Sequence, residues 1–417
     1  MAKISFKNPF RPGAGHMPPH LAGRSKETRE FHKLLQQEVI LENLVLTGLR
    51  GVGKTVLLDT FKPLALKEKW MWAGTDLSES VSISEEATVM RLLTDLSVVT
   101  SNTVFESGKI SSMGFNIKEE VVQENLNYTT LVNIFEAIPG LLSDKLKGVL
   151  EFVWSCIRDK EAKGIIFAYD EAQTMSDHAQ KGQYPLSLIL DVFQSLQRKS
   201  IRFMLVLTGL PTLFPKLVEA RTFSERMFRV MFLDRLGRRD CEEAILVPIR
   251  KASCLVKFSE PAIDAIIEKS GGYPYFIQFI CKESFDMYLQ QLSISSEGYI
   301  DYKKAIDDIT RKLDNDFFAG RWAKATDRQR ELLYAIANLP NCDDEFTVQE
   351  VVEEAQKSEK PFSSSHVNQM LSTLTNMGLV YKNRHGKYSF AVPLLGQYIL
   401  RQQSKFEKKQ GNYLFDI

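Results

Sequence analysis

A glycine-rich segment, Leu44 to Thr55, carries the clearest chemical signal in the chain. Gly48, Gly53, Lys54 and Thr55 fit the spacing G-x-x-x-x-G-K-[ST] of the Walker A pattern. Backbone N–H groups in such a turn converge on an anion, and the positive end of a following helix adds to the attraction. The pattern predicts a phosphate-binding loop in which Lys54 reaches the β- and γ-phosphates and Thr55 holds Mg²⁺. The loop residues are Gly48, Leu49, Arg50, Gly51, Val52, Gly53, Lys54, Thr55 and Val56.

A second signal lies more than a hundred residues downstream, where the apolar run Gly164 to Tyr169 ends in two acids. In the Walker B arrangement of P-loop ATPases, the first acid binds Mg²⁺ and the second polarises the attacking water. We therefore expect Asp170 to serve the metal and Glu171 to act as the general base. The alternative is an ordinary buried strand with a polar end, which the presence of the phosphate loop disfavours.

Polar and basic residues accompany two later strands. Thr208 ends the apolar run that starts at Phe203, and in a parallel sheet such strand ends face the ligand crevice. Thr208 therefore has two open interpretations, a contact to the attacking water or γ-phosphate and a simple strand-end cap. Arg226 and Arg229 lie just before the apolar residues 230–233, where an arginine can reach the γ-phosphate bound by a neighbouring subunit. An ordinary surface role is the alternative for each.

These residues need a scaffold, and the strands alternate with helical patterns as in an α/β fold. A helix with Phe31, Leu34 and Leu35 on one face precedes the phosphate loop, and the helix after the loop should end or kink at Pro63. The interval 78–163 looks like an insertion, with a helix at 85–98, a strand around Met113 to Ile117 and one or two helices at 131–158. A Ser/Asn/Gly-rich hairpin or loop is expected at 100–112.

The C-terminal part predicts a winged helix-turn-helix. Helices are expected at 327–337, 347–355 and 364–377, followed by a hairpin whose tip is basic. The third helix would present Ser363, Ser365, His366, Asn368 and Gln369, and the wing would present Lys382, Arg384, His385 and Lys387. Contact with double-stranded DNA would use Asn368, Gln369, Arg384 and Lys387. The alternative is a protein-binding module, because the third helix carries no lysine or arginine.

Composition places limits on these assignments. The 417 residues are 44% hydrophobic and 25% charged, which is ordinary for a soluble chain of two or three domains. A formal net charge of +1 excludes a chain that is basic throughout, so any nucleic-acid contact must be local. Five scattered cysteines indicate free thiols in a reducing compartment. Without a signal peptide or a long apolar run, we expect a cytoplasmic protein that does not bind membranes.

The order of motifs resembles the AAA+ ATPases of the origin-recognition initiator type and the related STAND regulatory ATPases. The resemblance implies ATP and Mg²⁺ as cofactors and adds an adenine pocket lined by Pro19, Leu21, Gly23 and Arg24. It also implies that Pro274, in the lid turn Gly272-Tyr273-Pro274, touches the base. The chain departs from the initiator pattern because no arginine lies between Ser270 and Ile280, where such lids usually carry a sensor arginine.

The expected organisation has an N-terminal arm (1–24), an AAA+ core (25–237), a helical lid (238–320), a winged helix (321–405) and a tail (406–417). The leading hypothesis is a molecular switch that binds and slowly hydrolyses ATP. Its nucleotide state would control assembly into a homo-oligomer and engagement of DNA or a partner by the winged helix. The alternative is a STAND-like signalling or defence regulator with negligible turnover that binds proteins instead of DNA. A metabolic kinase is disfavoured because no acceptor site can be picked out.

Overall fold

The computed structural model describes residues 7–113, 116–254, 257–294, 302–357, 360–384 and 386–413; side chains at 107–122, 291–294, 302–304, 384 and 405–413 are not described. The chain forms two compact units. The sheet unit comprises Ser25–Gly48 and Leu57–Phe232. The winged unit comprises Met1–Arg24, Leu49–Val56 and Leu233–Ile417. The phosphate loop thus groups with the lid and the winged helix, a division that differs from the boundaries expected from sequence.

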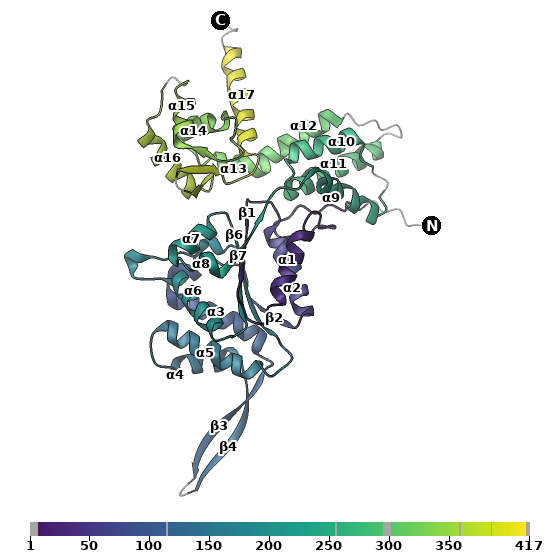
Figure 1. The fold of residues 1–417 in the computed structure, drawn as a ribbon. Helices are drawn as coiled ribbons and strands as arrows, with labels where there is room; N and C mark the ends of the chain where they lie inside the picture. The colour runs from purple at the N-terminus through teal and green to yellow at the C-terminus, as the bar shows by residue number, and fades with distance from the viewer. Residues whose placement is uncertain are drawn as a thin grey trace. The chain divides into compact units, whose positions relative to one another are not determined.

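The sheet unit is built on five strands in the order β2-β5-β6-β1-β7 (Figure 1). They are β1 (Asn43–Gly48), β2 (Trp70–Ala73), β5 (Gly164–Tyr169), β6 (Phe203–Gly209) and β7 (Phe228–Leu233). The pairs β2/β5, β5/β6 and β1/β6 are parallel. Because parallel neighbours require crossovers, helices cover both faces of the sheet. The expected α/β fold with a parallel sheet is confirmed.

Helices α1 (Ser25–Leu35) and α2 (Lys54–Lys67) cover one face of the sheet (Figure 1). The Phe31 ring stacks on Phe61 with centroids 4.1 Å apart and meets Trp72 edge-on at 6.3 Å. Aromatic rings in these geometries hold the two helices to the sheet. Pro63 lies inside α2, so of the two outcomes expected at this proline, a helix end and a kink, the helix end was wrong. The helix continues because the packing of Phe61 and Ala65 outweighs one lost backbone hydrogen bond.

The opposite face carries helices from the interval 78–163 and from the later crossovers (Figure 1). They are α3 (Glu85–Thr100), α4 (Tyr128–Ala137), α5 (Leu142–Ile157), α6 (Pro185–Arg198), α7 (Leu213–Ala220) and α8 (Ser224–Met227). Leu93, Phe135 and Val149 share one core with Phe167 and Phe203 of the sheet. The interval therefore contributes to the main core of this unit. Its hairpin of β3 (Val104–Met113) and β4 (Asn116–Asn125) extends outward from that core (Figure 1).

The winged unit begins with lid helices and ends with the winged helix. The lid helices are α9 (Arg238–Lys251), α10 (Glu260–Ser270), α11 (Pro274–Ile294) and α12 (Tyr302–Leu313). A π-helical turn (Asp314–Phe318) and α13 (Ala319–Trp322) lead to α14 (Asp327–Ala337), β8 (Phe346–Thr347), α15 (Val348–Ala355), α16 (Ser364–Asn376), β9 (Val380–Arg384), β10 (Lys387–Phe390) and α17 (Leu395–Tyr413). The expected three helices and hairpin are present, and β8 adds a third strand.

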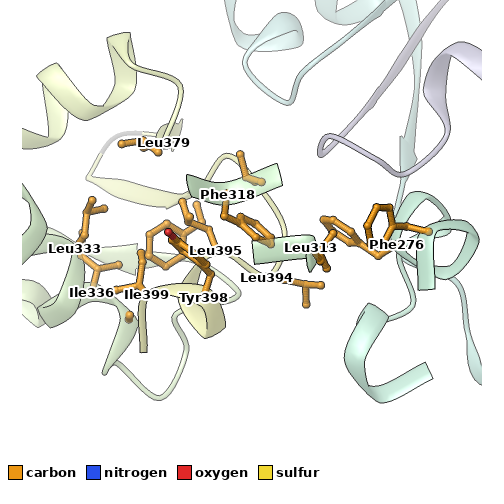
Figure 2. Close-up of a cluster of buried hydrophobic side chains, with 14 of the residues drawn as sticks. Phe276, Leu313, Phe318, Leu333, Ile336, Leu379, Leu394, Leu395, Tyr398 and Ile399 are labelled. Carbon is orange, nitrogen blue, oxygen red and sulfur yellow. The ribbon is translucent and has the colours of Figure 1, made fainter. Parts of the chain in front are cut away.

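One hydrophobic core runs through the lid and the winged helix. Figure 2 shows Phe276 and Leu313 from the lid continuing into Phe318, Leu395 and Tyr398. The rings of Phe318 and Tyr398 stack with centroids 5.1 Å apart. Position 320, expected as a domain border, thus falls within a continuous core. Helix α17 was not predicted; it begins within the expected winged-helix domain, and its residues 406–413 belong to the stretch expected to form a tail.

Within the described ranges, no helix is sufficiently long and apolar to cross a bilayer. All five cysteines belong to the described part and are free thiols; Cys241 and Cys281 are buried.

Candidate nucleotide-binding site

The phosphate loop connects the end of β1 to the start of α2. Gly51 and Gly53 have φ angles of +81° and +91°, a region that residues with a Cβ rarely adopt. A Cβ added to Gly53 would meet nothing within 4 Å, so the space over this residue is open. Lys54 is the first residue of α2, and the first turn of α2 contains no acid. The loop therefore offers backbone N–H groups and a helix N-terminus to an anion, as its sequence pattern predicts.

The loop is held by contacts within the winged unit. The guanidinium of Arg24 is buried and donates from Nη2 to the carbonyl oxygens of Val52 at 2.9 Å and Asp234 at 2.8 Å. The backbone N–H of Tyr275 donates to the carbonyl oxygen of Gly51 at 3.2 Å. Lys54 donates from Nζ to the carbonyl oxygen of Leu49 at 3.0 Å. These contacts fix the direction of the carbonyl groups of Leu49, Gly51 and Val52.

Residues expected at the adenine side belong to the same unit as the loop. Pro19, Leu21 and Gly23 are partly exposed, and Pro274 starts helix α11. Gly23 has a φ of +66°, and a Cβ there would lie 2.8 Å from the carboxyl carbon of Asp240. The described contacts of Arg24 are to backbone carbonyls, which makes it a support of the loop. An adenine contact for these residues stays a prediction.

Asp170 and Thr208 lie at equivalent levels of neighbouring strands. Ala168 pairs with Val206 and Leu46 with Thr208, so the register brings the end of β5, Thr208 and the end of β1 to one edge. Because side chains alternate along a strand, Asp170 lies on the same face of the sheet as Ile166, four residues earlier. Ile166 pairs with Trp72 of β2, and the Trp72 ring contacts Phe31 of α1. Asp170 and Thr208 thus point to the face covered by α1 and α2. Asp170 is 4% exposed and Thr208 is fully buried.

Thr208 retains an unused polar atom. Its Oγ1 has no hydrogen-bond partner within the described residues. A buried hydroxyl without a partner is costly, and such groups in native proteins usually point to a missing water or ligand. This orphaned hydroxyl, beside Asp170 at the carboxyl edge of the sheet, fits a site for nucleotide-bound water or phosphate.

Glu171 is held in an unusual conformation by its neighbours. Its φ and ψ are 52° and 29°, a left-handed conformation that costs a non-glycine residue free energy and clusters at functional sites. Its backbone N–H donates to Oδ1 of Asp170 at 2.8 Å. Its carboxylate Oε2 accepts from Nε2 of Gln173, and Oε1 of Gln173 accepts from the backbone N–H of Leu210 at 3.1 Å. Gln173 therefore links the acid pair after β5 to the end of β6.

Gln173 is not among the site residues predicted from the sequence. Lys216 of α7 strengthens the link, because its Nζ donates to the carbonyl oxygen of Gln173 at 2.7 Å and to Ser176 Oγ at 3.1 Å. Burial lowers the pKa of Lys216. The only signal available beforehand was a polar residue two positions after the acid pair.

The arginines around the start of β7 differ in their surroundings. Arg229 is ion-paired with Glu42 at 3.0 Å and with Glu30, and these contacts raise its pKa. Arg221 makes a bidentate pair with Asp191, both distances being 2.7 Å. Arg226 is exposed, and the described residues offer it no ion pair. Of the two candidates Arg226 and Arg229, only Arg226 has its guanidinium available.

The winged helix presents a polar surface. Ser363, Ser365, His366, Asn368 and Gln369 are all exposed on or next to α16, whereas Val367, Met370, Leu371 and Leu374 are buried beneath it. Lys382 is exposed and Lys387 is partly exposed in the wing. The side chain of Arg384 and the whole of His385 lie outside the described residues.

The sheet with its phosphate loop, the acid pair after β5, the helical lid and the winged helix define a P-loop ATPase fold of the AAA+ type, as in origin-recognition initiators. The resemblance found in the sequence is confirmed for the fold. The chain is similar to a Walker-type ATPase of Pyrococcus abyssi, with 17% identity, a TM-score of 0.56, and coverage of 91% of this chain and 96% of the other. It is also similar to the Aeropyrum pernix ORC2 protein in its ADP form, with 13% identity, a TM-score of 0.52, and coverage of 95% and 97%.

Two further similarities were found by comparing sequences. Residues 315–399, which contain the winged helix, match a family described as "Domain of unknown function (DUF8462)". An uncharacterized HTH-type transcriptional regulator of Methanocaldococcus jannaschii is 23% identical over 399 residues, which cover 93% of this chain and 90% of that protein.

Proposed function

We propose that this protein is an ATP-dependent molecular switch that binds Mg²⁺-ATP at the phosphate loop and hydrolyses it slowly to ADP and phosphate. The observation that carries the proposal is the shared level of Asp170 and Thr208 at the carboxyl edge of the sheet, next to the strand that leads into the loop. In open α/β sheets, ligands bind at this edge. The ADP form of the ORC2 protein adds support, since that protein holds a nucleotide on a similar fold.

Each residue has a distinct part in this proposal. Lys54 and the loop N–H groups hold the phosphates, and Thr55 with Asp170 supplies hydroxyl and carboxylate oxygens of the kind that Mg²⁺ prefers. The metal would neutralise charge on the β- and γ-phosphates. Glu171 takes the proton of the attacking water. Thr208 offers its unused hydroxyl to the same water or to the γ-phosphate.

Turnover would depend on assembly of several copies. The exposed guanidinium of Arg226 is free to reach the γ-phosphate held by a neighbouring copy, where a planar fork stabilises charge in the transition state. Arg229 is engaged with Glu30 and Glu42 and is the weaker candidate. Homo-oligomerisation on ATP binding follows from this assignment.

The winged helix would engage double-stranded DNA. The exposed polar residues Asn368 and Gln369 on α16 suit base edges, and Lys387 with Arg384 suits phosphates. The HTH-type regulator of Methanocaldococcus jannaschii supports DNA as the partner. A second candidate is a STAND-like regulator with negligible turnover that binds proteins, which the uncharged exposed face of α16 favours.

A nucleotide titration tests the core of the proposal. Lys54→Ala should abolish ATP and ADP binding in calorimetry, whereas Lys67→Ala, an exposed lysine on the same helix, should leave both intact. Glu171→Gln should keep ATP affinity and lower hydrolysis by roughly a hundredfold or more. Nucleotide binding by the Lys54 variant would refute the loop assignment. Mass in solution with and without ATP, repeated with DNA, separates the switch from the STAND-like alternative.

A further inference from the structure

The N-terminal arm of the winged unit is held at two points and exposed between them. At the outer point, Phe10 is 3% exposed, belongs to the core shared by the lid and the winged helix, and lies 6.3 Å from Phe258 between ring centroids. At the inner point, Ala22 is buried in the same core and Arg24 donates to the phosphate loop. None of the residues 11–21 between these anchors is buried. We call residues 11–21 the strap.

Polar contacts fix the outer anchor to one face of the lid helix α11. Asn8 donates from Nδ2 to the carbonyl oxygen of Lys282 at 2.9 Å and to Oδ1 of Asp286 at 2.7 Å. The backbone N–H of Arg11 donates to Oε1 of Gln278 at 3.2 Å. The three helix residues are spaced four apart, so they lie on one face of α11. The arm therefore follows the lid helix for about two turns before the strap begins.

A tight turn in the strap lies against the phosphate loop. The backbone N–H of His16 donates to the carbonyl oxygen of Gly13 at 3.3 Å and closes this turn. A Cβ added to Gly13 would lie 2.7 Å from Nδ1 of His16. Gly15 has a φ of +69°, and a Cβ added to it would lie 3.3 Å from Cγ2 of Thr55. The glycines thus allow the strap to approach Thr55, the residue expected to contact the Mg²⁺ of a bound nucleotide.

The strap combines stiff positions with hinge positions. Pro12, Pro18 and Pro19 fix the φ angles of three residues, whereas Gly13 and Gly15 supply backbone freedom. A segment that buries few side chains opens at a small cost in free energy, while burial of a phenylalanine holds the outer anchor in place. The strap can therefore lift from the phosphate loop without unfolding of the lid.

We propose that the strap is a gate for nucleotide exchange, which closes over Thr55 and must lift before a nucleotide enters or leaves the phosphate loop. This inference rests on the proposed function. It differs from the adenine contact expected of Pro19 and Leu21, because a contact changes affinity whereas a gate changes the rates of binding and release together. Since the outer anchor lies on α11, a partner that displaces the arm from this helix would accelerate exchange.

The test measures the association and dissociation rate constants of ADP that carries a fluorescent N-methylanthraniloyl group, by stopped flow. Asn8→Ala removes two hydrogen bonds of the outer anchor and should raise both rate constants by roughly five- to thirtyfold, which leaves the Kd within about twofold. Phe10→Ala should raise both further. Gly15→Ala should raise both by about fivefold, because its φ of +69° disfavours the closed strap. Asn338→Ala, an exposed asparagine after α14, is the matched control and should change neither.

The outcomes separate this inference from the proposed function. If the wild type binds no nucleotide, the proposed function fails and the inference fails with it. If the wild type binds and the folded Asn8→Ala and Gly15→Ala variants exchange nucleotide at wild-type rates, the gate alone is overturned. Faster release with unchanged association would raise the Kd and would also overturn it, because the arm would then be a contact for the nucleotide. Melting temperatures show which variants are folded, and Gly15→Ala keeps both anchors if Phe10→Ala does not fold.

Discussion

Gln173 holds the carboxylate of Glu171 through its side-chain amide and at the same time accepts a hydrogen bond from the backbone N–H of Leu210 at 3.1 Å. One side chain thus joins the proposed general base to the residue that follows β6, the strand that contains Thr208. A Cβ added to Gly209 would lie 2.6 Å from Gln173 Oε1, so the amide fills this position closely. Because Glu171 occupies a left-handed conformation, its carboxylate depends on this partner for its direction.

Gln173→Ala should therefore lower kcat for ATP hydrolysis by about ten- to a hundredfold while the Kd for nucleotide stays unchanged. The Gln173→Glu variant should hydrolyse ATP more slowly still, since its new carboxylate would repel that of Glu171. Gln349→Ala, an exposed glutamine on α15, serves as the control. Steady-state kinetics measure kcat, and calorimetry measures the Kd for nucleotide. A rise in Kd that matches the fall in kcat would indicate general damage to the site.

Substitution of Arg226 and of Arg229 should affect different properties, turnover for Arg226 and stability for Arg229. Arg226→Ala should lower turnover at protein concentrations that favour assembly, with little change in melting temperature, because this guanidinium has no described ion pair. Arg229→Ala removes two partly exposed ion pairs and should cost about 1 kcal/mol or less of stability. Mixing Arg226→Ala with Glu171→Gln protein should restore some hydrolysis. Failure to complement, with both proteins folded, would remove Arg226 from the catalytic assignment.

Arg24 should act through the phosphate loop. Arg24→Ala leaves the carbonyl oxygens of Val52 and Asp234 without this donor, and we expect a loss of about 1–3 kcal/mol of stability and roughly tenfold weaker binding of both ATP and ADP. Arg29→Ala, on the exposed side of α1, is the control. Denaturant unfolding and nucleotide titration measure the two effects. Unchanged affinity in a folded Arg24 variant would show that the loop does not need this support.

The joint core of the lid and the winged helix should be sensitive to one buried ion pair. Asp314 is 2% exposed and accepts from Nε of Arg401 at 3.0 Å and from Nη2 at 2.6 Å. Arg401→Ala leaves that carboxylate buried without its partner, so we expect a loss of about 2–3 kcal/mol. Arg311→Ala, which removes an exposed pair with Asp308, should cost far less. Thermal unfolding of the two variants provides the comparison, and equal melting temperatures would contradict it.

DNA binding should depend on the charge of the wing, which contacts phosphates, and on the side chains of α16, which contact base edges. Lys387→Ala should weaken binding to all sequences and reduce the slope of log K against log salt by about one. Asn368→Ala should weaken binding only to a preferred sequence, by about 1–3 kcal/mol. Lys357→Ala, an exposed lysine after α15, is the control. Affinity that does not respond to salt would favour a protein partner.

Local patterns were sufficient for much of the fold and for part of the site. The spacing of Gly48, Gly53 and Lys54 predicted the turn between β1 and α2, because a strand, a turn that needs glycine and a helix are encoded by consecutive residues. The continuous apolar run Gly164–Tyr169 likewise predicted β5, and the Thr347–Glu350 capping box marks the start of the helix expected at 347–355. Helix α17 could have been predicted from Leu395, Tyr398 and Ile399, whose spacing is helical.

The sequence by itself predicted a phosphate-binding loop and located most of the strands and helices, since these depend on neighbours along the chain. Only the tertiary structure decided that Gln173 reaches Glu171 and that Arg229 is ion-paired while Arg226 is exposed. Those relationships join residues through side-chain packing and charge between separate elements. Their partners are up to 199 positions apart, as for Arg229 and Glu30, and no local pattern records such a distance.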